Sequence, residues 1–274
     1  MAHPQQDQAQ HDLIVEREGH AMVLTMNRPE RFNAITGAML IRMYDAYEEA
    51  SNDPDVRCIV VTGAGGNFCS GADLRAMAGD SRDGDPMDTR ARMTTDPDIV
   101  YKALFRHYRP TKPIIAAVEG VAIAGGTELL QAMEIRVAGE SARFGVSEAR
   151  WSLYPMGGSA VRLPRQIPYT HAAEILLTAK HISAAEAKEI GLVGHVVPDG
   201  TALDKAMEIA EVVASNGPLA TAAITRTLHE CDGMELDEAL RHEWEYGQAV
   251  FASNDAKEGP KAFAEKRKPN FTGT

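Results

Sequence analysis

The pattern of apolar and polar residues predicts strands and a helix in the N-terminal part of the chain. Residues 13–26, LIVEREGHAMVLTM, alternate on both sides of the turn EGH, which is typical of a β-hairpin. Residues 36–50 begin at Thr36 and carry apolar side chains at helical spacing, so they predict a helix that Thr36 caps. The apolar run at 58–63, CIVVTG, predicts a buried strand.

Two core segments resemble each other. Residues 58–74 and 113–129 each contain an apolar strand, a glycine turn, a short apolar piece and a helix start with an acidic residue. When the segments are aligned at their ends, Asp73 falls on Glu128. This internal repeat predicts strand-strand-helix units, and right-handed connections between such units would stack them into a spiral α/β core.

The remaining segments predict a tail, a core and a helical region. Residues 1–12 are polar and predict a disordered tail, residues 13–200 form the predicted spiral core, and residues 201–274 carry long helical patterns with a basic end. The segment 76–111 contains an irregular loop, AGDSRDGDPMDTR, and a predicted helix, DIVYKALFRHY; so long a loop is more often functional than idle. Further helices are predicted at 170–180, 202–215, 218–231 and 235–252.

Composition excludes several classes of protein. Apolar residues make up 44% of the chain and charged residues 24%, as in an ordinary globular protein. The net charge of −11 argues against a nucleic-acid surface, which needs clustered Lys and Arg. No apolar run approaches the roughly 18 residues of a membrane span. The three cysteines show no CxxC spacing, so we expect a cytoplasmic protein rather than a disulfide-bonded one.

Two glutamates are the main candidates for chemistry. Glu128 follows the pair Gly125-Gly126 in the first turn of a predicted helix, where glycines bring backbone N–H donors close to a ligand. It could instead only cap its own helix. Glu148 follows FGVS and precedes the apolar stretch WSLYPMGGSAVRL, so partial burial would raise its pKa toward acid/base use. The alternative is a solvated loop residue or a partner for Arg150.

The other motifs leave few further options. The turn at 67–73, NFCSGAD, could supply another backbone N–H donor, or it could be a tight strand-to-helix connection with Asp73 as the cap. Ser70 does not lie in a GxSxG elbow, and the chain has no phosphate-binding loop or dinucleotide fingerprint. None of the nine histidines has metal-ligand spacing, so we expect no metal site.

Seven motifs in order resemble those of one family: NRPERFNAI, NFCSGADL, AAVEGVAIAGGTELL, FGVSE, PMGGS, AAEAKEIGLV and AFAEKRKPNF. Over residues 13–271 the chain resembles the crotonase (enoyl-CoA hydratase/isomerase) superfamily. Within it, the chain is most similar to bacterial enoyl-CoA hydratases, including members linked to sterol side-chain breakdown. The resemblance implies a crotonase-like spiral with a C-terminal helical region that serves oligomerisation and covers coenzyme A (CoA).

The resemblance also implies roles for particular residues. The backbone N–H groups of Ala72 and Gly125 would form an oxyanion hole, and Glu128 and Glu148 would be the catalytic pair, with their acid and base roles left open. Isomerases of the family typically lack the glutamate that corresponds to Glu128. The CoA moiety would contact Arg31, Ala34, Ala72, Asp73, Leu74, Arg75, Gly125, Phe263 and Lys266, the last two often from a neighbouring subunit.

Three departures from the family pattern lie near the expected acyl pocket. Ala124 replaces the first glycine of a usual triple-glycine run, Met156 replaces a common glycine, and the 76–111 segment is long. They bear on acyl-chain preference more than on the class of reaction. Side chains that could line this pocket, although such residues are more often core, are Met77, Tyr101, Phe105, Trp151 and Met156.

The expected activity is addition of water to a trans-2-enoyl-CoA, giving a 3-hydroxyacyl-CoA in fatty-acid or sterol side-chain β-oxidation. CoA would enter as part of the substrate, without any further cofactor, and the protein would be a homotrimer or homohexamer. The alternatives are another crotonase reaction, such as enoyl-CoA isomerisation or carnitinyl-CoA dehydration, and a non-catalytic acyl-CoA-binding scaffold. RNA binding, known among relatives, is disfavoured by the acidic charge balance.

Overall fold

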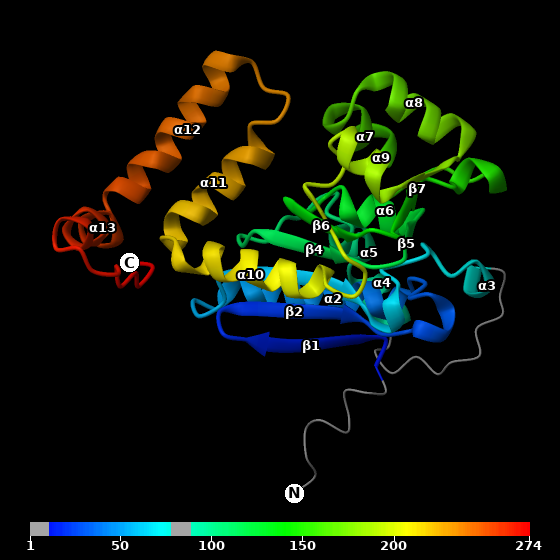
Figure 1. The fold of residues 1–274 in the computed structure, drawn as a ribbon, viewed down its shortest axis with the longest axis horizontal. Coiled ribbons are helices and arrows are strands. Elements are labelled where there is room, and N and C mark those ends of the chain that lie inside the picture. Colours follow the sequence, from blue (N-terminus) through cyan, green and yellow to red (C-terminus); the bar gives the residue numbers. More distant parts are fainter. Residues whose placement is uncertain (1–10, 78–88) are drawn as a thin grey trace, which may run out of the picture.

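The computed structural model describes residues 11–77 and 89–274. Most of the tail expected at 1–12 and of the loop expected at 78–90 therefore lies outside the described residues. Figure 1 shows a core of strands and helices from which three C-terminal helices extend to one side. This arrangement confirms the predicted α/β core with a C-terminal helical region.

The main sheet has six strands in the spatial order β1-β2-β3-β4-β6-β9. The first two strands form the predicted antiparallel hairpin, in which Leu13 pairs with Met26, and all later neighbours are parallel. The strands are β1 (Leu13–Glu18), β2 (Ala21–Met26), β3 (Cys58–Gly63), β4 (Ile114–Val118), β6 (Ile135–Gly139) and β9 (His195–Val197).

A smaller sheet explains the internal repeat. Its strands are β5 (Val121–Ile123), β7 (Arg143–Gly145) and β8 (His181–Ser183). Strands β5 and β7 are parallel, and a parallel bridge between Cys69 and Ala122 adds the first repeat to the same layer. Each repeat therefore gives one strand to the main sheet and a short piece to the second layer, as the spiral prediction requires.

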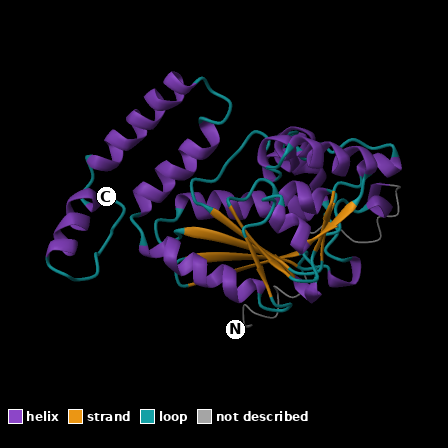
Figure 2. Ribbon diagram, turned by 45° about the horizontal axis from the view of Figure 1, so that its top comes forward, coloured by secondary structure: helices purple, strands orange, loops and turns teal. Residues whose placement is uncertain are grey.

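Both faces of the main sheet are covered, which explains its near-continuous apolar strands. Along β3, Ile59 and Val61 pack into a large cluster with helix α2 (Gly37–Asn52), whereas Val60 packs into a second cluster with α10 (Ala202–Ser215). Figure 2 shows the strands between these helices. Helix α10 thus belongs to the layer that covers the sheet, although it follows the boundary expected at residue 200.

The helices mostly follow the predicted pattern. Thr36 caps α2 by accepting the N–H of Met39 at 3.0 Å, as expected. The helix predicted over DIVYKALFRHY is shorter than expected, and the helix Thr89–Thr95, which was not predicted, begins at the end of the expected loop 78–90. The other helices are α3 (Leu74–Met77), α4 (Thr89–Thr95), α5 (Ile99–Ala103), α6 (Gly125–Leu130), α7 (Ser159–Gln166), α8 (Tyr169–Thr178), α9 (Ala184–Glu189), α11 (Pro218–Glu230), α12 (Leu236–Phe251) and α13 (Asp255–Ala264), with 3₁₀ turns η1 (Pro29–Arg31), η2 (Ala64–Gly66) and η3 (Glu148–Trp151).

Candidate active site

Glu128 is held in a buried cradle at the start of helix α6. Its side chain is only 4% exposed, and its carboxylate accepts the backbone N–H groups of Gly157 and Ser159, both at 3.0 Å. A Cβ atom on Gly157 would lie 2.6 Å from Oε2 of Glu128, so only glycine permits this approach. The carboxylate therefore binds a distant loop rather than the first turn of its own helix, against the simple capping alternative.

The electrostatics of Glu128 combine opposing effects. Burial raises the pKa of its carboxyl group, because an apolar environment disfavours the charged form. The hydrogen bonds from Ser159 and Gly157 and the positive charge of Arg162 oppose that rise by stabilising the carboxylate.

Glu148 lies in a different environment. It opens the turn η3 directly after β7, and its Oε2 atom is buried without a hydrogen-bond partner among the described residues. Burial and the negative charge of Glu128 raise the pKa of Glu148 to about 7, confirming the expected direction. Ser147 before it lies 2.8 Å from Nε2 of His181, so strand β8 helps to hold the turn. The two carboxylates therefore interact, and the backbone donors that stabilise the charge of Glu128 have no counterpart at Oε2 of Glu148 among the described residues.

Thr127 connects the elements that carry the two glutamates. Its buried hydroxyl oxygen accepts a hydrogen bond from the N–H of Gly145 at 3.1 Å. The hydroxyl group in turn donates toward the carbonyl oxygens of Ala122 and of Gly145, the latter at 3.0 Å. Gly145 is the last residue of β7, three positions before Glu148. One side chain on α6 thereby fixes the strand end that presents the second glutamate.

The backbone nitrogens of Ala72 and Gly125 lie near each other at the start of helix α6. Ile35 and Ala72 form a parallel β-bridge: the N–H of Ile35 donates to the carbonyl of Gly71 at 2.8 Å, and the carbonyl of Ile35 accepts from the N–H of Asp73 at 3.0 Å. In such a bridge the N–H of Ala72 itself points away from Ile35. On that other side, a Cβ atom on Gly125 would lie 3.6 Å from the Ala72 nitrogen. The N–H of Gly125 is the first of helix α6 and has no intrahelical acceptor. The structure thus places near each other the two backbone nitrogens to which the family resemblance assigns the oxyanion hole.

Ala124 enters this site in a backbone conformation that glycine normally adopts. Its φ and ψ angles are 52° and −123°, whereas L residues rarely have a positive φ. Its N–H donates to the carbonyl of Gly145 at 2.7 Å, which holds the strained turn in place. Alanine at position 124, where the family usually has glycine, therefore stores backbone strain immediately before the N–H of Gly125.

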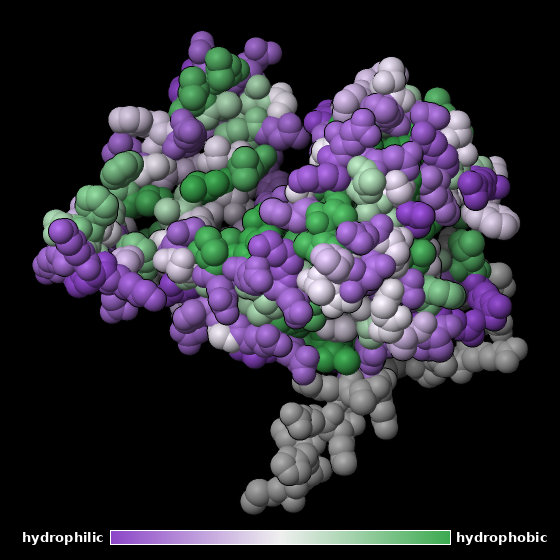
Figure 3. All heavy atoms as spheres, in the orientation of Figure 1, coloured by the Kyte–Doolittle hydropathy of each residue, from purple (hydrophilic) through white to green (hydrophobic). Residues whose placement is uncertain are grey.

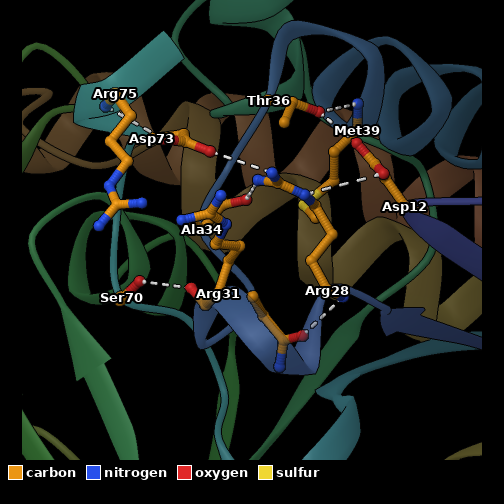
Figure 4. A network of polar contacts seen from close by, with 10 residues as sticks. Asp12, Arg28, Arg31, Ala34, Thr36, Met39, Ser70, Asp73 and Arg75 are labelled. Atoms are coloured by element: carbon orange, nitrogen blue, oxygen red, sulfur yellow. Dashed lines mark hydrogen bonds and ion pairs between the residues drawn. The ribbon is translucent and has the colours of Figure 1, made fainter. Parts of the chain in front are cut away.

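Arg28 organises the loop predicted to contact CoA, as Figure 4 shows. Its guanidinium group donates to the carbonyl of Ala34 at 2.7 Å and to the carboxylate of Asp73 at 3.0 Å, and its Nε lies 3.9 Å from Asp12. The loop before α2 is thereby joined to the Ala72 segment. Sequence reasoning missed Arg28; its place in the NRPERFNAI motif was visible, but no local spacing indicated its partners.

The remaining CoA candidates fall into two groups. Arg31, Leu74 and Arg75 are exposed beside the Arg28 network, and Ala34 is buried there. Phe263 is 87% exposed on α13, and Lys266 follows that helix. Figure 1 places α13 and α3 at opposite ends of the molecule. One chain therefore does not bring the two groups together.

The acyl-pocket candidates also separate. Arg106 lies over the ring of Tyr101 at 5.6 Å and donates to the carbonyl of Met156 at 2.6 Å, so these two candidates are neighbours. Phe105, in contrast, is 3% exposed and packs against Tyr47 at 4.8 Å between ring centroids, so most of its side chain contributes to the hydrophobic core. The side chain of Trp151 is 66% exposed on η3, and that of Met77 lies outside the described residues.

Two further observations concern the described part of the chain. Within residues 11–77 and 89–274, no group of three or more His, Cys, Asp or Glu side chains could hold a metal ion. Over the same residues, no helix is both long enough and apolar enough to cross a bilayer.

Comparison with known proteins agrees with this geometry. The family model described as enoyl-CoA hydratase/isomerase matches residues 16–274. An enoyl-CoA hydratase of Mycobacterium tuberculosis is 57% identical over 95% of this chain and 96% of its own length. The 2,3-dehydroadipyl-CoA hydratase of Escherichia coli is 34% identical over 96% of this chain and 99% of its own length.

A solved structure is also similar. The crystal structure of an enoyl-CoA hydratase from Mycobacterium tuberculosis superposes with a TM-score of 0.86 at 39% identity, covering 96% of this chain and 99% of that one. The sequence motifs, the spiral of two sheets and the paired glutamates lead to the same conclusion as these similarities. The chain belongs to the enoyl-CoA hydratase/isomerase family, the crotonase superfamily.

Proposed function

We propose that this protein is an enoyl-CoA hydratase that adds water across the double bond of a trans-2-enoyl-CoA to give a 3-hydroxyacyl-CoA. The observation that carries the proposal is the pair of glutamates in unlike environments, close to the neighbouring backbone nitrogens of Ala72 and Gly125. Two titratable groups whose surroundings separate their pKa values can act as base and acid at one pH. A binding scaffold would not need this separation.

The proposed chemistry follows from the position of each group. Attack of water at the β-carbon moves charge onto the thioester oxygen, and the N–H groups of Ala72 and Gly125 would stabilise that oxyanion. Losing one such donor typically costs roughly 100- to 1,000-fold in rate. The N–H groups bound to Glu128 favour its ionised form, so it would take the proton from water. Glu148, protonated up to a pH of about 7, would donate the α-proton.

The family resemblance and the free cysteines bear on the setting of this reaction. No metal or redox group takes part in the proposed steps, and CoA is part of the substrate. The free cysteines, of which Cys58 and Cys69 are buried, favour a reducing compartment such as the cytoplasm. A fatty-acid or sterol side-chain enoyl-CoA is the proposed substrate class.

Loss of the ultraviolet absorbance of a conjugated enoyl thioester tests the activity directly. We would use purified protein with short, long and steroid-side-chain enoyl-CoAs, and confirm the 3-hydroxyacyl-CoA product by mass. The variants Glu128→Gln and Glu148→Gln should each lose most turnover while they remain folded. Near-normal turnover in either variant, or a shifted double bond as the product, would reject the assignment.

We also propose that copies of the chain assemble into a trimer or hexamer through the extended helices α11, α12 and α13. Their exposed apolar residues exceed what single surface positions explain, and Figure 3 shows apolar side chains over this arm and in the gap beside the core. A cavity of about 1360 Å³ lies between α11 and the core. The residues concerned are Ile224, Leu228, Leu236, Leu240, Trp244 and Phe251.

Assembly would also bring Phe263 and Lys266 of one copy to the CoA loop of another. Light scattering after size exclusion should give three or six times the mass of the 29.7 kDa chain. Lys266→Ala should raise KM for an enoyl-CoA more than it lowers kcat. A stable, fully active monomer would contradict this proposal.

A further inference from the structure

Arg162 on α7 uses its guanidinium group to join three separate segments. Its Nη1 atom donates to the carbonyl of Gly157 at 2.9 Å and lies 3.4 Å from that of Glu128. Its Nη2 atom donates to the carbonyls of Leu104 and Phe105 at 3.0 and 2.8 Å. One side chain therefore contacts helix α6, the loop that precedes α7, and the end of α5.

These contacts explain two local features. Helix α5 ends at Ala103, and Phe105 adopts a positive φ of 58°, because the Leu104 and Phe105 carbonyls turn toward Arg162 instead of continuing the helix. Gly158 has a φ of 116°, and a Cβ atom there would lie 3.0 Å from Cζ of Arg162. The guanidinium group thus packs flat against Gly158, and the N–H of the next residue, Ser159, binds the carboxylate of Glu128.

A second contact fixes the same loop from the other side. The amide nitrogen of Gln131 donates to the hydroxyl oxygen of Ser159 at 2.9 Å, and the N–H of Ser159 binds Glu128. Gln131 and Glu128 lie on one face of the chain around α6, three residues apart. The two donors to Glu128 are therefore held between Gln131 and Arg162.

The guanidinium group of Arg162 is directed at carbonyl oxygens. Among the described residues, no carboxylate lies within ion-pairing distance of its guanidinium group, which donates only to carbonyl oxygens. Three other arginines, Arg106, Arg109 and Arg136, act on it with the same sign of charge, and Glu128 acts on it with the opposite sign. Burial lowers the pKa of Arg162 to about 10, so the group keeps its charge at neutral pH. Among the described residues, the negative charge that acts on Arg162 is that of Glu128.

We propose that Arg162 is a positioning residue for the proposed hydration: it holds the Gly157 and Ser159 donors at Glu128 and places a positive charge beside this glutamate. The inference rests on the proposed function. It also links the cradle of Glu128 to the end of α5, where Tyr101 and Arg106 meet the Met156 loop. The charged groups that face Glu128 are Arg162 and Glu148.

Three variants separate the charge of Arg162 from its shape. Arg162→Gln removes the charge and most contacts, and Arg162→Lys keeps the charge but cannot reach four carbonyls from one ammonium group. Arg165→Gln is the matched control, because Arg165 lies on the same helix, is exposed, and donates to the carbonyl of Val161 rather than to the cradle. All are compared with wild type by circular dichroism to confirm folding.

Two readouts test the proposal. The first is the pH dependence of kcat/KM with trans-2-butenoyl-CoA and trans-2-octenoyl-CoA. The second needs no substrate: a ¹³C NMR titration of protein labelled at glutamate side-chain carboxyls, in which Glu128→Gln identifies the Glu128 signal. A nearby opposite charge lowers a carboxyl pKa by roughly 1–3 units, so Arg162→Gln should raise that of Glu128 by about 1 unit.

The expected kinetic results follow. In Arg162→Gln the acidic limb of the kcat/KM profile should shift to higher pH by the same amount as the Glu128 titration measured by NMR. The value of kcat should also fall about 100-fold, since small misplacements of a catalytic group cause losses of this size. Arg162→Lys should keep the wild-type limb with a smaller fall in kcat, and Arg165→Gln should match wild type.

Different results would reject different statements. An unshifted Glu128 titration in folded Arg162→Gln, wild-type kcat in Arg162→Lys, or an equal shift in Arg165→Gln would overturn the role of Arg162. If Arg162→Gln does not fold, the kcat of Arg162→Lys decides. A wild-type protein that hydrates neither substrate would count against the proposed function, while the NMR titration would still decide whether Arg162 sets the charge of Glu128.

Discussion

Replacement of Glu148 by Gln should stabilise the protein above neutral pH while it removes activity. The carboxyl group of Glu148 is buried enough to have a pKa of about 7, and its Oε2 atom lacks a hydrogen-bond partner among the described residues. Ionised Glu148 is therefore an unfavourable charge in the folded protein. Glutamine has a similar shape and cannot ionise, so it removes this cost.

The size of the effect follows from linkage between protonation and folding. A pKa of about 7 against the ordinary 4.5 corresponds to roughly 3 kcal/mol if the group were dry. Because Glu148 is only half-buried, solvent screens part of this, and we expect about 1–2 kcal/mol. Because folding raises the pKa of Glu148, the carboxyl group contributes its full stability to the folded protein below the pKa of the unfolded state, near 4.5. This contribution is lost as the pH rises through the folded-state pKa of about 7.

The assay is thermal unfolding at pH 5 and pH 8, at equal protein concentration. Glu148→Gln should unfold at nearly the wild-type temperature at pH 5 and about 2–6 °C above it at pH 8. Glu49→Gln, which changes an exposed glutamate on α2, is the control and should show no such difference. An equal Tm difference at both pH values, or none at pH 8, would refute the reasoning.

Three further substitutions probe the framework. Gly157→Ala should lower kcat by roughly 100-fold with a smaller change in KM, since its Cβ would lie 2.6 Å from the Glu128 carboxylate; steady-state kinetics measures this, and an unchanged kcat would argue against the cradle. Ala124→Gly should raise stability by about 1 kcal/mol by relieving its positive φ, and a lower Tm would contradict the strain. Thr127→Val should cost about 1–3 kcal/mol in unfolding experiments, because Gly145 loses its hydroxyl partner; wild-type stability would contradict that role.

The elements that sequence predicted well are those with a local signal. Alternation on both sides of EGH gave the β1–β2 hairpin, and Thr36 before an apolar period of helical spacing gave α2. The internal repeat predicted the spiral, because each copy contributes the same strand to each sheet. The roles of Ala72 and Gly125 were taken from the family resemblance and stay a prediction; the structure shows that their backbone nitrogens lie near each other.

What could not be predicted depends on contacts between distant residues. The Arg162 contact that ends α5 joins positions 58 residues apart, and Arg28 meets Asp73 across 45 residues. The donors to Glu128 come from 29 and 31 residues further along the chain. No periodicity or cap indicates such partners. The burial of Phe105 could not be predicted for the same reason: an aromatic residue near a loop has no local sign that it packs on Tyr47.

Incorporation of oxygen from water tests the central claim most directly. The protein would be incubated with a trans-2-enoyl-CoA in water enriched in ¹⁸O, and the product analysed by mass spectrometry with fragmentation of the acyl chain. The account predicts a 3-hydroxyacyl-CoA with one ¹⁸O atom at the β-carbon, formed by wild type but scarcely by Glu128→Gln or Glu148→Gln. A product without ¹⁸O and with a shifted double bond, or the same labelled yield from Glu128→Gln, would contradict it.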